Sequence, residues 1–271
     1  MGNRDFLKYK KRIVIKVGTS SLSYENGRLN FQRIEKLAFV LSSLRNRGLQ
    51  IVLVSSGAIG VGAGRIGMTI RPHKIEEKQA LAAIGQAELI KIYQKFFEGY
   101  NQTVAQVLLT KDIMTNTERH TNAKSTLTRL LEMRIIPIIN ENDTIATFEI
   151  EFGDNDTLSA DVATLIEADL LILLSDIDGM YNGDPKTNKS ARIIHRIEEI
   201  TPELEKLASG AGTSFSTGGM ITKIGAAKIC TQAHIDTIIT NGNNPSLLFD
   251  ILDGKEIGTH FVAQKKETAK N

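Results

Sequence analysis

Short runs of apolar residues recur along the chain and alternate with longer segments of helical periodicity. The runs are RIVIKV, IVLV, VAQVLL, IIPII, DLLILLSD and DTIIT, starting at Arg12, Ile51, Val104, Ile135, Asp169 and Asp236. A strand that is apolar throughout needs cover on both faces, and parallel strands need helical crossovers between them. The alternation therefore predicts an α/β fold with a mainly parallel sheet between helices.

The intervening segments have helical spacing. Ile34, Leu37, Leu41 and Leu44 recur at steps of three or four residues, and Gly48 is placed to end that helix. Further helices are predicted over residues 74–97, 122–133 and about 219–233. A last strand is predicted near THFVA. In the segment TIATFEIEFGDND, residues 144–156, apolar residues instead alternate with other residues at a two-residue period. This pattern predicts a half-exposed strand or hairpin that projects as a flap.

Composition excludes several classes of protein. The chain has 271 residues, a net charge of +2 and 24% charged residues, so no global field draws it to nucleic acid or anionic lipid. Its single cysteine, Cys230, cannot form an internal disulfide, and no apolar segment is long enough to cross a bilayer. We expect a cytoplasmic protein with one domain over residues 1–264 and a short polar tail over residues 265–271.

Small and polar residues follow the strands where the strands end. GTSSL follows the first, SSGAIG the second, NEND the fourth and SDIDG the fifth. Ligands of open parallel sheets bind beyond the carboxyl ends of the strands, so a site is expected there. At Ser56 and Gly57, backbone NH groups entering a helix suit an anion. A simple helix cap by Ser55 or Ser56 is the alternative.

Two lysines stand in unusual positions. Lys16 lies within the first apolar strand, where a charge is costly unless it is paired or faces a polar site; a solvated edge position is the alternative. Lys223 ends SFSTGGMITK, a stretch that lacks the G-x-x-x-x-G-K-[ST] phosphate cradle. We predict that Gly218 and Gly219 open a helix whose NH groups face phosphates.

Residues 140–143, NEND, and residues 154–156, DND, combine carboxylates with amides. Brought together by a hairpin, they would offer oxygen atoms to an ammonium group or a divalent cation. Ordinary turn chemistry is the alternative.

Gly62, Gly64 and Gly67 match the dinucleotide pattern G-x-G-x-x-G, but they do not directly follow a strand and lack the distal acidic residue. We interpret them as allowing close helix packing.

Six motifs, in order, resemble the amino-acid kinase family. They are VIKVGTSSL, VLVSSGAIGVG, INENDTIAT, GDNDTLSADVA, LLSDIDGMYNGDP and TGGMITKIGAA. Within the family they are similar to the branch that phosphorylates the side-chain carboxylate of L-glutamate. The resemblance implies a three-layer αβα sandwich and transfer of the ATP γ-phosphoryl group, giving L-glutamyl 5-phosphate in the first step of proline synthesis.

The resemblance also implies roles for individual residues. Lys16 and Lys223 would neutralise the transferring phosphoryl group, and Asp156 would orient them. The expected glutamate-binding residues are Ser56, Gly57, Asp143 and Asn155. The expected ATP-binding residues are Lys16, Ser175, Asp176, Thr217, Gly218, Gly219, Met220, Ile221, Thr222 and Lys223. Position 175 often holds Thr in the family, and Ser175 keeps the hydroxyl. Mg²⁺ would arrive with ATP, so no metal site built from protein side chains is expected.

A carboxylate acceptor is already ionised at neutral pH, so the chemistry requires no general base and fits a chain whose five histidines are scattered. Many family members carry an additional C-terminal RNA-modification-type (PUA) domain, which we do not expect in this chain of 271 residues. A dimer or tetramer is expected, and proline is a candidate feedback inhibitor.

Two alternatives remain at this point. One is a related kinase for aspartate or N-acetylglutamate, and the other is a non-catalytic protein that binds nucleotide and amino acid. Asp143 argues against an acetylated substrate, because a free amino group needs an acidic partner. Lys16, Lys223 and Asp156 argue against a non-catalytic protein.

Overall fold

The computed structural model describes residues 4–24, 27–68, 72–146, 155–185, 187–210 and 219–265. These residues form an eight-stranded sheet in the order β3-β4-β2-β1-β5-β7-β8-β6. The strands are β1 Arg12–Val17, β2 Gln50–Ser55, β3 Val104–Leu109, β4 Ile136–Glu141, β5 Leu170–Ser175, β6 Arg196–Ile197, β7 Asp236–Asn241 and β8 Thr259–Phe261. Neighbouring strands of this sheet are parallel except β7 and β8, which are antiparallel.

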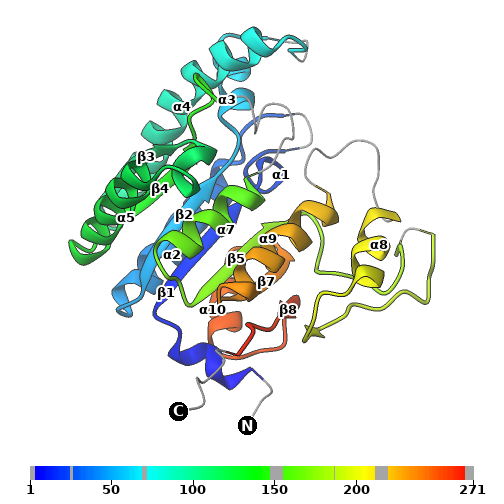
Figure 1. The fold of residues 1–271 in the computed structure, drawn as a ribbon. Helices are drawn as coiled ribbons and strands as arrows, with labels where there is room; N and C mark the ends of the chain where they lie inside the picture. Colours follow the sequence, from blue (N-terminus) through cyan, green and yellow to red (C-terminus); the bar gives the residue numbers. More distant parts are fainter. Residues whose placement is uncertain are drawn as a thin grey trace.

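Helices cover both faces of the sheet (Figure 1). Helices α2 Phe31–Asn46, α4 Ile75–Glu98 and α10 Leu247–Leu252 share one apolar core with the sheet, and α5 Thr117–Glu132, α7 Asp156–Leu165 and α9 Met220–Gln232 share the other. In Figure 1, α7 and α9 lie side by side in front of the central strands. The predicted α/β class and three-layer αβα arrangement are thus confirmed.

Shorter elements complete the described chain. They are the 3₁₀ helices η1 Asp5–Tyr9 and η2 Lys111–Met114 and the α-helices α1 Thr19–Leu22, α3 Ala58–Arg65 and α8 Pro202–Gly210. Helices α1, α7, α8 and α10 and strand β6 were not predicted, whereas α3 is the helix that was expected to follow Ser56 and Gly57. Strand β6 has only two residues, which is too short for any periodic signal. Helix α3 forms although it is rich in glycine, which is a poor helix former.

Strand β1 shows how the two-residue period positions the site. Ile13, Ile15 and Val17 lie in the core beneath α2 and α10, whereas Val14 lies in the core beneath α7 and α9. Successive side chains of a strand point to opposite faces, so Lys16 faces the same way as Val14. The lysine is buried on the side of α7 and α9, and the solvated alternative is wrong.

The start of α7 corrects one prediction. Asn155 is the N-cap residue and Asp156 the first residue of α7, so neither belongs to a hairpin. Residues 143–145 form a turn after β4, where the alternating pattern had predicted a strand. The rest of the predicted flap, residues 147–154, and most of the predicted tail lie outside the described residues.

The glycine-rich helix α3 packs on α4 with almost no space between the backbones. A Cβ atom on Gly62 would lie 2.0 Å from the carbonyl oxygen of Leu81, and one on Gly85 would lie 1.7 Å from that of Ala58. The packing interpretation is therefore confirmed for Gly62. It is wrong for Gly64 and Gly67, where no described atom lies within 4 Å of such a Cβ.

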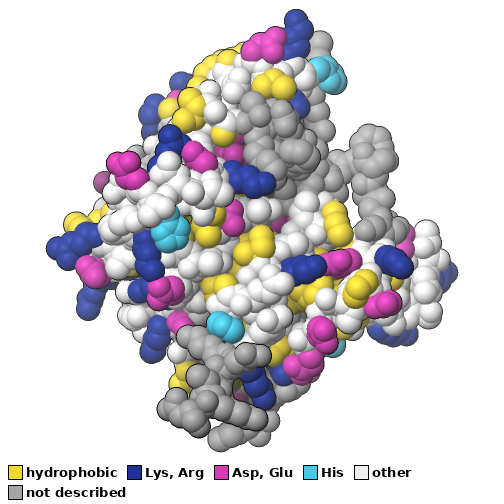
Figure 2. Space-filling view, in the orientation of Figure 1, with side chains coloured by type: hydrophobic (Ala, Val, Ile, Leu, Met, Phe, Trp, Pro, Cys, Tyr) yellow, Lys and Arg dark blue, Asp and Glu magenta, His cyan; other side chains and the backbone are white. Residues whose placement is uncertain are grey.

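The surface matches the near-neutral composition. Figure 2 shows basic and acidic side chains interspersed over the visible face. Within the described ranges, no helix combines the length and the apolar character that a membrane crossing requires.

Candidate active site

A buried carboxylate joins two lysines at the carboxyl edge of the central strands. Asp156 Oδ1 lies 2.6 Å from Lys16 Nζ, and Asp156 Oδ2 lies 3.1 Å from Lys223 Nζ. The hydroxyl of Thr222 donates to Asp156 Oδ2 at 3.0 Å. Because all three charged side chains are buried, their attraction is weakly screened. Asp156 therefore holds the two ammonium groups at one place.

Each of these side chains comes from a different element of the fold. Lys16 is the penultimate residue of β1, Asp156 opens α7, and Lys223 lies in the first turn and a half of α9. A carboxylate in the first turn of a helix is stabilised by the positive end of the helix dipole. The site therefore depends on the packing of α7 beside α9.

A chain of amides lies next to this ion cluster. Asn155 Nδ2 donates to the hydroxyl oxygen of Ser56 at 3.0 Å and to Asn140 Oδ1 at 2.7 Å. Asn140 Nδ2 in turn donates to Gln86 Oε1 at 2.9 Å. Asn155 precedes Asp156 in sequence, so the amide chain and the ion cluster are joined by one peptide bond.

Asp143 follows β4 and is buried. Among the described residues, no hydrogen-bond partner reaches its Oδ1 atom. Burial, together with the nearby charge of Glu141, raises the pKa of Asp143 to about 7. The backbone carbonyl of Asp143 accepts from Gln79 Nε2 at 3.1 Å, which ties the turn to α4. A buried carboxylate in this state gains most from a cationic partner.

Gly57 turns the chain from β2 into α3. Its φ of +108° lies in the left-handed region, where a side chain would be strained. Gly57 itself is the N-cap of α3, and no described side chain caps the helix, so the serine-cap alternative is wrong. Ser55 instead pairs with the hydroxyl of Tyr93 at 2.8 Å, and Ser56 receives the Asn155 amide.

The predicted nucleotide-binding residues lie at the ends of β5 and α9. Ser175 is buried at the last position of β5 and donates to the exposed Asp176 at 3.0 Å. Gly219 precedes α9, which begins with Met220 and the exposed Ile221. The predicted helix opening is confirmed for Gly219. Thr217 and Gly218 lie outside the described residues.

Sequence reasoning missed two participants. Gln86 and Tyr93 lie in α4, and their hydrogen bonds reach residues 54 and 38 positions away, so no local pattern marks them. Thr222, which was predicted to bind the nucleotide, contacts Asp156 and the carbonyl of Gly219 in the described chain. Cys230 is fully buried in α9, as expected of a core residue.

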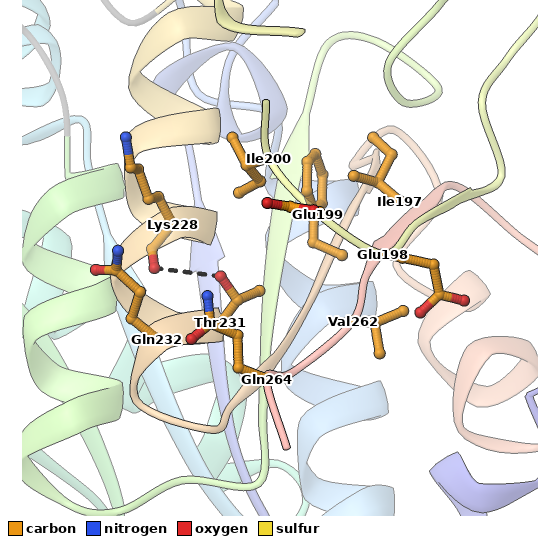
Figure 3. A pocket seen from close by; sticks show the side chains of 10 residues that line it. Ile197, Glu198, Glu199, Ile200, Lys228, Thr231, Gln232, Val262 and Gln264 are labelled. Carbon is orange, nitrogen blue, oxygen red and sulfur yellow. Dashed lines mark hydrogen bonds between the residues drawn. The ribbon is translucent and has the colours of Figure 1, made fainter. Parts of the chain in front are cut away.

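A pocket elsewhere has different chemistry (Figure 3). It is lined by β6, β8 and the last turns of α9, where the hydroxyl of Thr231 donates to the carbonyl of Lys228 at 3.2 Å. Lys223 lies near the opposite end of α9, and none of the predicted site residues lines this pocket. Within the described ranges, no three His, Cys, Asp or Glu side chains are grouped to hold a metal ion.

Comparison with known proteins decides the family. Residues 11–241 match the amino acid kinase family. The chain belongs to this family. The amino acid kinases similar to it include the glutamate 5-kinase of Clostridium perfringens (strain 13 / Type A), which is 55% identical over 268 residues, covering 97% of this chain and 100% of the relative. The glutamate 5-kinase of Listeria monocytogenes serovar 1/2a is 54% identical, covering 97% of each chain.

Solved structures agree on the amino acid kinase fold. The carbamate kinase from Giardia lamblia, bound to AMP-PNP, superposes with a TM-score of 0.66 at 15% identity and covers 94% of this chain and 99% of its own. At that identity the likeness concerns the fold alone. The family resemblance read from the six sequence motifs is confirmed.

Proposed function

We propose that this amino acid kinase transfers the γ-phosphoryl group of ATP to the side-chain carboxylate of L-glutamate. The products are L-glutamyl 5-phosphate and ADP, as in the first step of proline synthesis. The observation that carries the proposal is the Asp156 carboxylate holding Lys16 and Lys223 beside the Asn155 amide. Identity of 55% and 54% to two proteins named glutamate 5-kinase supports this acceptor.

The reaction needs no general base. A glutamate side chain has a reference pKa of about 4.3 and is ionised at neutral pH. One of its oxygens forms a bond to the γ-phosphorus while the bond from that phosphorus to the β–γ bridging oxygen breaks, and ADP carries the electron pair away. Phosphoryl transfer of this kind depends on positioning and on charge stabilisation.

Lys16 and Lys223 are assigned the stabilising role. Their ammonium groups would contact the γ-phosphoryl oxygens and the bridging oxygen, where negative charge develops in the transition state. Asp156 positions both groups through its two carboxylate oxygens. Mg²⁺ bound to the nucleotide phosphates would neutralise further charge.

The acceptor end is assigned to Asp143, Ser56, Gly57 and Asn155. Asp143 would bind the α-ammonium group of glutamate, which compensates a carboxylate that burial otherwise disfavours. The Ser56 hydroxyl and the backbone NH groups that follow Gly57 would bind the α-carboxylate. An acetylated amine has no positive charge to offer Asp143, so N-acetylglutamate is disfavoured.

The nucleotide end is assigned to Ser175, Asp176 and the stretch from Thr217 to Lys223. The NH groups at the start of α9 suit phosphate oxygens, and Gly219 adds no side chain beside them. At the carboxyl end of β5, Ser175 and Asp176 would contact the nucleotide.

A substrate panel tests the proposal. ADP release is measured with L-glutamate, L-aspartate, N-acetyl-L-glutamate, carbamate and buffer alone, each with and without Mg²⁺. We expect Mg²⁺-dependent ADP release with L-glutamate at least 100-fold above the other acceptors. Equal release with all acceptors, or preference for aspartate, would contradict the assigned acceptor. A chain that binds ATP and glutamate without turnover would instead be a regulator.

We also propose that proline inhibits the enzyme by feedback, that the chain forms a homo-oligomer and that it works in the cytoplasm. Proline has an ammonium and a carboxylate in the same relation as glutamate, so it offers the same groups to Asp143 and Ser56. Initial rates across a proline series at fixed glutamate test inhibition, and unchanged rates would refute it. Light scattering of the purified chain gives the subunit number, and cell fractionation gives the location.

A further inference from the structure

In the amide chain beside Asp156, each side-chain amide has a defined orientation, with its NH₂ group as donor at one end and its oxygen as acceptor at the other. The backbone carbonyl of Ser55 favours one orientation. Asn155 Nδ2 lies 3.4 Å from the carbonyl oxygen of Ser55, which can only accept hydrogen bonds. With its NH₂ group at this end, Asn155 faces three oxygen atoms that can accept, those of the Ser55 carbonyl, the Ser56 hydroxyl and the Asn140 amide. Its partner Asn140 consequently presents Oδ1, at 2.7 Å.

The direction continues to α4. Since Asn140 uses its oxygen toward Asn155, its NH₂ group points the other way and needs an acceptor. Gln86 Oε1 supplies that acceptor at 2.9 Å. Asn140 and Asn155 are both fully buried, so an unsatisfied amide in either would be costly.

The direction also fixes what Ser56 can do. Its oxygen accepts a hydrogen from Asn155 Nδ2 at 3.0 Å. The hydroxyl proton of Ser56 is then left to donate elsewhere, and a substrate carboxylate is an acceptor. A reversed amide chain would turn the Asn155 oxygen toward Ser56 and consume that proton.

We propose that Gln86 is a positioning residue for the acceptor. By accepting from Asn140 it holds Asn140 and Asn155 in the orientation that leaves the Ser56 hydroxyl free to bind a carboxylate. This rests on the proposed function only for the identity of that carboxylate. Gln86 acts through Asn140 and has no part in the ion cluster of Asp156.

The position of Gln86 is set by the close contact of α3 and α4. Gly85, the residue before it, has no room for a Cβ atom against the carbonyl of Ala58. Helix α4 therefore cannot shift on α3 at this point without separating backbones. The glutamine reaches Asn140 from a rigid support, as a positioning residue requires.

The test uses Gln86→Met, which has similar length and no strong acceptor. The matched control is Gln94→Met, the same change on the exposed side of the same helix. Steady-state kinetics give KM for glutamate and for ATP, and calorimetry gives glutamate affinity without turnover. We expect KM and Kd for glutamate to rise roughly tenfold in Gln86→Met, with KM for ATP changed less than twofold and the control unchanged.

A double-mutant cycle separates positioning from a general structural role. In an Asn140→Ala background, Gln86→Met should change glutamate affinity by less than twofold, because the group through which it acts is gone. The inference is overturned by an unchanged glutamate Kd in Gln86→Met, by equal rises in both KM values, or by full additivity with Asn140→Ala.

The outcomes also distinguish this inference from the proposed function. If the wild-type chain binds glutamate but phosphorylates nothing, the proposed reaction fails while the glutamate Kd still tests Gln86. If another acceptor is used, the same comparison is made with that acceptor. If the wild-type chain binds no carboxylate acceptor, both proposals fail.

Discussion

Asn155 and Asp156 are consecutive residues whose side chains serve different halves of the site. Asn155 donates to Ser56 at 3.0 Å, whereas Asp156 contacts Lys16 at 2.6 Å and Lys223 at 3.1 Å. One peptide bond at the start of α7 therefore links the residues proposed to bind glutamate to those proposed to stabilise the transferred phosphoryl group. Alignment of two reactants is the main requirement of in-line phosphoryl transfer, and this link supplies a rigid connection.

Removing either lysine should abolish most of the turnover. For Lys16→Met and Lys223→Met we expect kcat to fall by about 10²–10⁴, because each loses a charge directed at the transferring group. Asp156 keeps its other lysine and Thr222 in each variant, so the loss of stability should stay below the roughly 3–5 kcal/mol of a fully broken buried pair. Kinetics and urea unfolding measure the two effects; near-normal kcat in either variant would refute the assigned roles.

Asp156→Asn should impair catalysis more than substrate binding. The amide keeps the shape but loses the charge that holds both ammonium groups, so they are expected to separate. We predict a fall in kcat of about 10²-fold or more with KM for glutamate changed less than fivefold. A variant whose KM rises while kcat is kept would instead place Asp156 in substrate binding.

The raised pKa of Asp143 predicts opposite pH effects on stability and on binding. Its pKa is raised from 3.8 to about 7, so the free folded chain binds more protons than the unfolded chain between these values. Stability contributed by this group is therefore present below about pH 4 and is lost as the pH rises through 7. Glutamate binding needs the carboxylate, so KM for glutamate should fall between pH 6 and pH 8.

The Asp143→Asn variant tests the pH effect on stability and the pH effect on glutamate binding together. The variant should unfold at a higher temperature than the wild type at pH 8, and the difference should shrink as the pH falls and vanish below about pH 4, where the wild-type carboxyl is protonated in both the folded and the unfolded chain. Its KM for glutamate should be high at every pH. A variant that is less stable than wild type at pH 8 would show that Asp143 is already compensated in the free chain.

The contact between α3 and α4 should tolerate no added carbon. For Gly85→Ala we expect a loss of about 3 kcal/mol or more, because the atom it would meet is a backbone carbonyl that cannot rotate away. Gly64→Ala on the exposed side of α3 is the control and should be neutral or stabilising by up to about 1 kcal/mol. Denaturant unfolding of both variants measures this; equal stabilities would mean that α4 moves freely on α3.

Much of the fold could be predicted because most of its strands are nearly continuous apolar runs. The strand at Val104–Leu109 was predicted to the residue, and the helix predicted over residues 74–97 is α4, Ile75–Glu98. Lys16 could be singled out because a charge inside an apolar strand demands a partner. Its partner Asp156 could be named only by family resemblance, since the two are 140 positions apart in sequence.

Other features depend on tertiary contacts that leave no local signal. The stretch GDND is typical of a turn, yet Asp156 starts a helix because the following residues pack against the sheet and α9. Gln86 and Gly85 are an ordinary polar residue and an ordinary glycine in a helical pattern, and only the approach of α3 and β4 gives them a role. The assignments of individual residues to glutamate and to ATP, and the domain limits at residues 1–264, stay predictions.

The most direct test of the central claim is chemical trapping of the product. The chain is incubated with ATP, Mg²⁺, L-glutamate and hydroxylamine, with Lys223→Met as the matched negative control. An acyl phosphate reacts with hydroxylamine to give a hydroxamate, so we predict glutamyl hydroxamate in amounts equal to the ADP released, and almost none with the control. ADP release without hydroxamate, or hydroxamate only when another carboxylic acid replaces glutamate, would contradict the account.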